Sequence, residues 1–251
     1  METRPKLVIF DCDGVLVDSE LIVSAAEAAE ITRVGRPITV AEAVHKFAGV
    51  PAKDMYRSIE EELGMPLPKD FSERVDERVR QLYLSELAAI PSARETIRAL
   101  RIPCCVASSS APNRLGLALA KTELFELFYP YIFSTVLVRN GKPAPDIFLY
   151  AAEKMGVAPA DTFVVEDSIA GVTAAKAAGM TALGFLGGSH CSPSHDVCLK
   201  EAGAKYIFSR FEDLLPIVEG SARELGHVPG IPSEIVQKVQ EITNGAPATA
   251  S

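Results

Sequence analysis

Short apolar runs that each stop at a polar residue are the feature that most constrains how this chain can fold. Between these runs lie stretches with helical periodicity. Strands that alternate with helices of about 10–15 residues are typical of βαβ units and a mostly parallel sheet. The carboxyl ends of such strands share one edge of the sheet, where ligands bind. The runs with strand character are 6–10, 103–107, 162–165, 181–185 and 205–208, and the helical stretches are 92–100, 113–125, 146–155 and 168–178.

Residues 19–90 interrupt this alternation of strands and helices, because they contain helical patterns and no strand. The four helical candidates are 21–31, 40–47, 52–63 and 71–89. The pattern predicts an α/β fold, with a Rossmann-like, mostly parallel sheet core and an inserted all-helical cap domain. The predicted divisions are a core of residues 1–17 and 91–225, a cap of residues 18–90, and residues 226–251 as a C-terminal helix (233–242) with a disordered tail.

The net charge and the cysteine content limit which partners and which cellular compartment we expect for the protein. Lysine and arginine number 25 against 33 acidic residues, a net charge of −8. This balance argues against nucleic acid or a membrane surface as a partner, although a few local cations still suffice for a small anion. The five cysteines are scattered, no apolar run approaches the length of a membrane span, and the N-terminal residues do not resemble a signal peptide. We therefore expect a cytoplasmic protein.

Two carboxylates, Asp11 and Asp13, directly follow the first apolar run. Two like charges this close cannot both ionise cheaply, so their proton affinities separate. One can then bind a metal ion while its neighbour carries a proton. Gly14 lets the backbone approach a ligand closely or adopt a positive φ angle. The alternative interpretation is a strand-end turn in which an aspartate caps a helix.

Polar residues also follow or flank later elements of the predicted sheet. Ser108 begins a run of three serines, where a hydroxyl and free backbone N–H groups can bind an anion. Lys142 lies between a glycine and a proline, which stiffens its backbone. Glu166 and Asp167 end the most apolar run and offer the oxygen ligands that Mg²⁺ prefers. Each motif alone also fits helix capping or a solvated side chain, but together with Asp11 they indicate one site.

In this order, the motifs resemble those of the haloacid dehalogenase superfamily, and within it the sugar-phosphate phosphatase and β-phosphoglucomutase-like branch. The resemblance extends from about Leu7 to Phe208. Its first motif, Asp-x-Asp-Gly-Val-Leu-Val-Asp-Ser-Glu over residues 11–20, is the most specific. The others are Ser108, then Lys142 with Pro143 and Asp146, then Glu166-Asp167.

The resemblance implies a role for each of these residues. Asp11 would be the nucleophile that becomes an aspartyl phosphate. Asp13 would protonate the leaving alcohol and then activate water, and its backbone carbonyl would bind Mg²⁺. Asp167 would complete the metal site, with Glu166 as a helper or a more distant ligand. Ser108 would hold the phosphoryl oxygens.

Further residues are implied to contact the substrate. Lys142 would hold the phosphoryl group, together with backbone N–H groups near Asp13, Gly14 and Ser109. Glu20 lies in a loop expected to shape specificity, and Lys53 could supply a cation from the cap. The expected substrate is a small phosphorylated metabolite such as a sugar phosphate.

Departures from the family pattern bear on which reaction is favoured. A β-phosphoglucomutase-like protein would have a histidine where this chain has Val23, and an arginine where Pro51-Ala52-Lys53 stands. Both departures favour hydrolysis over mutase activity, and the second acid, Asp13, disfavours a dehalogenase. A phosphomutase and a non-catalytic module that binds phosphorylated metabolites remain the alternatives.

A further cluster contains His190, Cys191, His195 and Cys198 within nine residues. Zinc takes ligands of these types. The spacing does not match a usual zinc finger, so a loop near the ligand-binding edge is the favoured interpretation.

Overall fold

The computed structural model describes residues 4–47, 50 and 52–220. Its centre is a six-stranded sheet of order β3-β2-β1-β4-β5-β6 in which every neighbouring pair is parallel. This order is that of a doubly wound Rossmann-like sheet, so the predicted α/β fold is confirmed. The strands are β1 (Leu7–Phe10), β2 (Cys104–Ser108), β3 (Ile132–Ser134), β4 (Thr162–Glu166), β5 (Thr181–Phe185) and β6 (Tyr206–Phe208).

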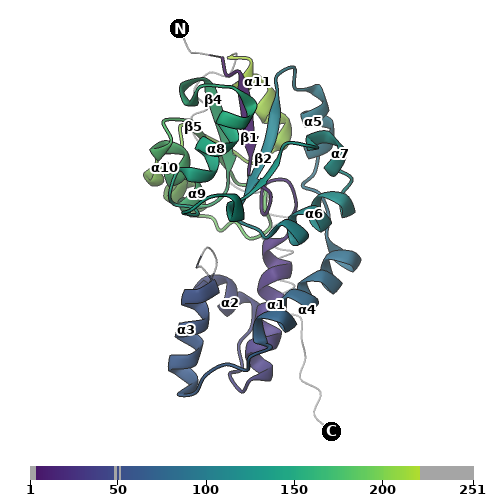
Figure 1. The fold of residues 1–251 in the computed structure, drawn as a ribbon, viewed down its shortest axis with the longest axis vertical. Coiled ribbons are helices and arrows are strands. Elements are labelled where there is room, and N and C mark those ends of the chain that lie inside the picture. Colours follow the sequence, from purple (N-terminus) through teal and green to yellow (C-terminus); the bar gives the residue numbers. More distant parts are fainter. Residues whose placement is uncertain (1–3, 48–49, 51, 221–251) are drawn as a thin grey trace.

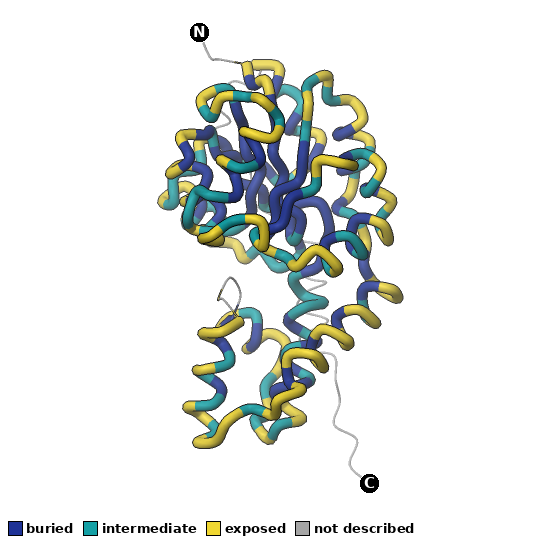
Figure 2. The backbone as a smooth tube through the Cα atoms, in the orientation of Figure 1, coloured by how far each residue is buried: buried dark blue, intermediate teal, exposed yellow. Residues whose placement is uncertain are grey.

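Helices cover both faces of the sheet (Figure 1). Alternate side chains of β1 point to opposite faces, with Val8 and Phe10 in one apolar cluster and Leu7 and Ile9 in the other. The first face carries α5 (Ala93–Ala99), α6 (Pro112–Lys121), α7 (Phe125–Phe128) and α11 (Leu214–Val218); the second carries α8 (Asp146–Met155), α9 (Ile169–Ala177) and α10 (His195–Ala202). Buried residues therefore concentrate along the strands (Figure 2). Among the helices of the described residues, none has the length and apolarity that a bilayer-spanning segment requires.

The structure differs from the sequence-based expectation in several places, and α11 was not predicted. Strand β3 was not predicted, because it has only three residues and its pairing with β2 defines it. The helix expected over 113–125 is divided into α6 and α7, since Glu123 adopts a φ of 58° and ends the first helix. The segment expected to be a loop after residue 187 contains α10. The predicted helix over 233–242 lies outside the described residues.

Of the five helices that the structure describes between β1 and β2, the first four form a unit that projects from the sheet (Figure 1). They are α1 (Glu20–Arg33), α2 (Val40–Phe47), α3 (Ala52–Leu63) and α4 (Phe71–Glu86). The two segments that join this helical unit to the sheet, 16–18 and 88–90, run side by side. An antiparallel bridge pairs Val17 with Ala89, and the Asp18 N–H donates to the Ala88 carbonyl at 3.0 Å. The unit is thus attached through two paired segments of chain.

A buried carboxylate ties α1 to α4 inside the helical unit. Glu30 of α1 is 1% exposed and accepts hydrogen bonds from Arg33, Arg74 and Arg78 at 2.6, 3.0 and 3.1 Å. Burial acts to raise the pKa of Glu30, but the three arginines outweigh it and hold this pKa below its usual value. The ionised form of Glu30 therefore stabilises the folded state.

We expect Glu30→Gln to lower the free energy of unfolding by about 1–3 kcal/mol at pH 7, because hydrogen bonds to a charged acceptor are lost. The pKa of Glu30 is lower in the folded state than in the unfolded chain. Its contribution is therefore complete above the unfolded pKa, about 4.3, and disappears as the pH falls through the folded pKa. Urea denaturation of both proteins at pH 7 and near pH 3 measures this difference.

Glu77→Gln is the matched control, because Glu77 pairs with Arg80 on the exposed surface of α4. Its unfolding midpoint should stay close to that of the unmodified protein at neutral pH. An equal loss in both variants would contradict a special role for the buried carboxylate.

Candidate active site

The carboxyl ends of β1 and β4 meet where the strand order reverses, which is where ligands bind in open α/β sheets. Asp11 directly follows β1, Glu166 is the last residue of β4, and Asp167 follows it. All three are buried, and one carboxylate oxygen from each lies within 4.8 Å of the others. The topology thus gathers three acidic side chains from two distant parts of the chain.

Lys142 places an ammonium group inside this acidic cluster. Its Nζ donates to Asp11 Oδ1 and to Glu166 Oε1, both at 2.6 Å, and to the Ala107 carbonyl of β2 at 3.1 Å. The Lys142 side chain is 5% exposed. Its ammonium also lies 4.9 Å from the centre of the Phe148 ring, a cation–π distance. Lys142 therefore joins the ends of three neighbouring strands.

The acidic cluster carries more negative charge than Lys142 can balance. Burial is the main reason that the pKa of Asp11 lies well above its usual value; Lys142 opposes this effect, and Glu166, Asp167 and Asp13 add to it. Burial also raises the pKa of Asp167, and the neighbouring Glu166 raises it further. For Lys142, burial acts to lower the pKa, but the adjacent Asp11 and Glu166 carboxylates outweigh it and raise it. The balance of charge favours an additional cation here.

Glu166 has both carboxylate oxygens engaged. Oε1 accepts from Lys142, while Oε2 accepts from the backbone N–H groups of Asp167 and Ser168 and from the Ser168 hydroxyl. A Cβ atom at Gly171 would lie 1.8 Å from Oε1, so only glycine leaves room for this carboxylate. These contacts suit Glu166 to positioning Lys142 and the start of α9.

Asp13 lies two residues from Asp11 but contacts hydroxyl groups instead of the acidic cluster. Its Oδ1 accepts from Ser19 at 2.6 Å and from Tyr83 at 3.2 Å, and its Oδ2 accepts from Ser110 at 2.6 Å. Ser19 directly precedes α1 and Tyr83 lies in α4, whereas Ser110 follows β2. The Asp13 carboxyl is thus held where the sheet meets the helical unit.

These three hydroxyl partners were not selected from the sequence. Ser110 is part of the serine run, and Ser19 is part of the first motif, so both had a sequence signal. Tyr83 had none, because it lies 70 residues from Asp13 and reaches it only through the packing of α4.

Other predicted residues occupy varied positions around this edge. Ser108 is buried, and its Oγ accepts from the Ser110 N–H at 3.0 Å, which shapes the turn after β2. Ser109 is exposed at the same turn. Gly14 has a φ of 73°, and its N–H already donates to the Val17 carbonyl. A Cβ at Gly14 would lie 1.9 Å from Asp167 Oδ2, so glycine makes room for that carboxylate.

Two predicted substrate contacts come from the helical unit. Glu20 is the first residue of α1; burial, followed by the nearby Asp167 and Asp13 carboxylates, raises its pKa to about 8. Glu20 therefore lies in the electrostatic field of the acidic cluster. Lys53 is exposed near the start of α3. Among the hydrogen bonds of the described residues, none joins Lys53 to the other predicted site residues.

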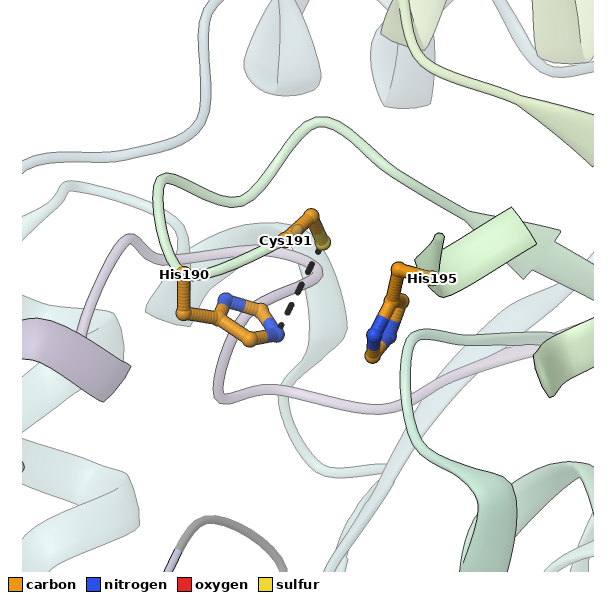
Figure 3. A group of neighbouring side chains, drawn as sticks. All are labelled: His190, Cys191 and His195. Carbon is orange, nitrogen blue, oxygen red and sulfur yellow. Dashed lines mark hydrogen bonds between the residues drawn. The ribbon is translucent and has the colours of Figure 1, made fainter. Parts of the chain in front are cut away.

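The loop after β5 and the first residue of α10 bring two histidines together (Figure 3), and both contact Asp167. His190 Nε2 lies 3.0 Å from Asp167 Oδ2, and His195 Nε2 lies 2.5 Å from the Asp167 carbonyl oxygen. Burial lowers the pKa of His190, although the Glu20 and Asp18 carboxylates oppose this effect. The sequence placed this loop near the ligand-binding edge, but the contact with Asp167 depends on how the loop folds.

The acidic cluster has the donor set of a magnesium site. Mg²⁺ takes oxygen ligands and usually binds one or two carboxylates, with water and phosphate at its other positions. Asp11 and Asp167 supply two buried carboxylates, and burial is the main reason that the pKa of each lies above its usual value. The residues present therefore fit a hard dication.

The comparisons with known proteins agree with this geometry. A family model described as haloacid dehalogenase-like hydrolase matches residues 5–179, and the chain belongs to this family. It is 32% identical to the 6-phosphogluconate phosphatase of Escherichia coli over 76% of this chain and 87% of that protein. It is 33% identical to the phosphorylated carbohydrates phosphatase of Thermotoga maritima, over 69% of this chain and 81% of that protein.

A solved structure of a haloacid dehalogenase-like protein from Agrobacterium tumefaciens shares the fold. It superposes with a TM-score of 0.78 at 38% identity, over 87% of this chain and 99% of that one. The family and the hydrolase class expected from the sequence are therefore confirmed.

We expect Lys142→Met to lower the free energy of unfolding by about 3–5 kcal/mol at pH 7 in the presence of a metal chelator. The substitution leaves the buried Asp11 and Glu166 carboxylates without their cation. The loss should shrink as the pH falls, because protonated carboxyl groups no longer need a positive partner. Urea denaturation at pH 7 and pH 5 measures both effects.

Lys154→Met, an exposed position near the end of α8, is the control and should change stability little at either pH. A Lys142→Met variant with unchanged stability at pH 7 would contradict the proposed charge balance.

Proposed function

We propose that this protein is a cytoplasmic, Mg²⁺-dependent phosphatase that hydrolyses a small phosphorylated metabolite, such as a sugar phosphate. The observation that carries the proposal is the contrast between two neighbouring carboxyls. Asp11 lies among charged side chains, whereas Asp13 lies among hydroxyl groups. Two carboxyls in different environments suit a nucleophile and an acid–base group. The relatives named as phosphatases of 6-phosphogluconate and of phosphorylated carbohydrates support the substrate class.

Asp11 acts as the nucleophile in this proposal. Lys142 holds Oδ1, so Oδ2 is the oxygen directed to the substrate. This oxygen forms a bond to phosphorus while the bond from phosphorus to the ester oxygen breaks, which leaves an aspartyl phosphate. Lys142 also balances negative charge on the phosphoryl group.

Asp13 moves the proton in both halves of the reaction. It gives a proton to the departing alkoxide oxygen, which leaves as an alcohol. It then takes a proton from a water molecule as that water attacks phosphorus, which releases inorganic phosphate and restores Asp11. Hydrogen bonds from Ser19, Tyr83 and Ser110 fix the carboxyl in place for this transfer.

Asp11 and Asp167 would hold Mg²⁺, with the Asp13 backbone carbonyl as a further oxygen ligand and Glu166 as a supporting residue. When bound, Mg²⁺ supplies positive charge that offsets repulsion between the carboxylate and the phosphate. The burial of both carboxylates, with ligand oxygens of Asp11, Glu166 and Asp167 within 4.8 Å of one another, supports this assignment.

The helical unit acts as a cap over the substrate, with residues 18–90 as the cap and residues 1–17 and 91–225 as the core. Closure of such a unit excludes water and completes a site. Its contacts with the core support this role, because Ser19 and Tyr83 reach Asp13 directly. Glu20 at the start of α1 and Lys53 of α3 are the proposed specificity residues. Residues 48, 49 and 51, near Lys53, lie outside the described residues.

Hydrolysis is favoured over phosphomutase activity. The position where a mutase-like relative would have a histidine is Val23, a partly buried side chain of α1 that packs against the apolar core. Valine has no group that can transfer a proton.

A phosphate-release screen across phosphorylated metabolites tests the proposal. Release should require Mg²⁺, stop with a chelator, and disappear in Asp11→Asn while circular dichroism shows an intact fold. Asp161→Asn is the control and should keep its activity, because Asp161 pairs with Lys6 ahead of β4, whereas the acidic cluster lies at the carboxyl end of that strand. Isomerised ester without free phosphate would indicate a mutase instead, and turnover by Asp11→Asn would contradict the nucleophile assignment.

Asp13→Asn should slow hydrolysis of alkyl phosphates by about 10²- to 10⁴-fold, the usual range for loss of a general acid–base group. An aryl phosphate with an acidic leaving group needs less proton donation, so its rate of phosphorylation of Asp11 should fall less. Single-turnover measurements on both substrates isolate that step. Equal losses on the two substrates would count against Asp13 as the acid.

A further inference from the structure

We propose that His190, Cys191 and His195 form a binding site for a transition-metal dication of borderline softness, with Zn²⁺ as the best match. Its nitrogen and sulfur ligands distinguish this site from the proposed magnesium site, and Asp167 borders both sites. Imidazole nitrogen and thiolate sulfur are ligands of Zn²⁺, whereas Mg²⁺ takes oxygen. The inference does not depend on the phosphatase proposal.

The three side chains converge from the loop after β5 and from the first residue of α10 (Figure 3). One ligand atom of each lies within 4.8 Å of the others. Cys191 Sγ is 3.7 Å from His190 Nε2. With Zn–S near 2.3 Å, Zn–N near 2.0–2.1 Å and a tetrahedral angle, the expected S···N separation is about 3.6 Å. The pair is therefore already spaced as two ligands of one ion.

Local turns explain how ligands with an unfamiliar spacing come together. The Cys191 N–H donates to the Gly188 carbonyl at 3.1 Å, and the His195 N–H donates to the Ser192 carbonyl at 3.0 Å. These turns fold the loop back, so that the two imidazole rings lie with centroids 5.7 Å apart and planes at 83°. Cys198 lies further along α10 and is not part of this group.

The second nitrogen of the His190 ring has an unusual environment. His190 Nδ1 is buried and has no hydrogen-bond partner among the described residues. Buried polar atoms without partners are rare in folded proteins and call for an explanation. Because Nε2 is the nitrogen that faces Cys191 and Asp167, an ion at this site would coordinate Nε2 and leave the proton on Nδ1.

Asp167, which is also a proposed Mg²⁺ ligand, lies beside the three side chains. Its Oδ2 lies 3.0 Å from His190 Nε2, within reach of an ion held by the two histidines and the cysteine. Carboxylate oxygen is an accepted fourth ligand of Zn²⁺. On binding, the Cys191 thiol releases its proton to solvent and coordinates as thiolate.

Titration of the metal-free, full-length protein with Co²⁺ tests the site. A cysteine ligand should produce a thiolate-to-cobalt charge-transfer band in the near ultraviolet, which one equivalent of Zn²⁺ should remove. Cys191→Ser should lose this band and bind Zn²⁺ at least tenfold more weakly in competition with a chelator. Cys198→Ser is the matched control and should keep both properties.

His195→Gln provides a second test, should Cys191→Ser fail to fold by circular dichroism; it should also weaken Zn²⁺ binding at least tenfold. The proposal is overturned if Co²⁺ binds the unmodified protein without a charge-transfer band. It is equally overturned if both variants bind Zn²⁺ as tightly as the unmodified protein, since the ion would then occupy other ligands, such as the carboxylates of Asp11 and Glu166.

Discussion

The ammonium group of Lys142 is the interaction on which the sheet edge depends. It bridges Asp11 after β1, Glu166 at the end of β4 and the Ala107 carbonyl of β2. Burying carboxylates in a protein interior is costly unless charge partners and hydrogen bonds compensate for the lost water. Because one cation serves two carboxylates, the ends of three strands are held together before any ligand binds.

The contrast between Asp11 and Asp13 follows from this arrangement. Only Cys12 separates them in the sequence, yet Asp11 lies among charged side chains and Asp13 among hydroxyl groups. Environment rather than residue type thus distinguishes the two carboxyls. The distinction requires the helical unit, because two of the hydroxyls that contact Asp13 come from the segment between β1 and β2.

Most of the fold was predictable because each element has a local signature. Helices α2 and α3 begin and end where the periodicity indicated; β1 is an unbroken apolar run, and β4 has three consecutive apolar residues between Thr162 and Glu166. Strand β3 was missed because three residues carry too little pattern, and its identity comes from pairing with β2. Helix α10 was missed because the polar and cysteine-containing segment around it resembles a loop.

The residues of the candidate site also divide into those that the local sequence predicts and those that it does not. Asp11, Glu166 and Asp167 could be placed together because a parallel sheet gathers the ends of its strands. The partner of Asp13 in the serine run could not be identified, since the turn after β2 decides that Ser110 and not Ser108 reaches it. Tyr83 and His190 reach the site through helix packing and loop folding, which local sequence does not encode.

The carboxylate of Glu30 has a mechanical consequence for the helical unit. By binding arginines of both α1 and α4, it makes these two long helices one stiff body. The same two helices meet the core through the paired segments 16–18 and 88–90 and through Asp76 of α4, which pairs with Arg114 of α6. Since Tyr83 lies on α4 and Asp13 follows β1, a rotation of the helical unit against the core would change the hydrogen bond between them.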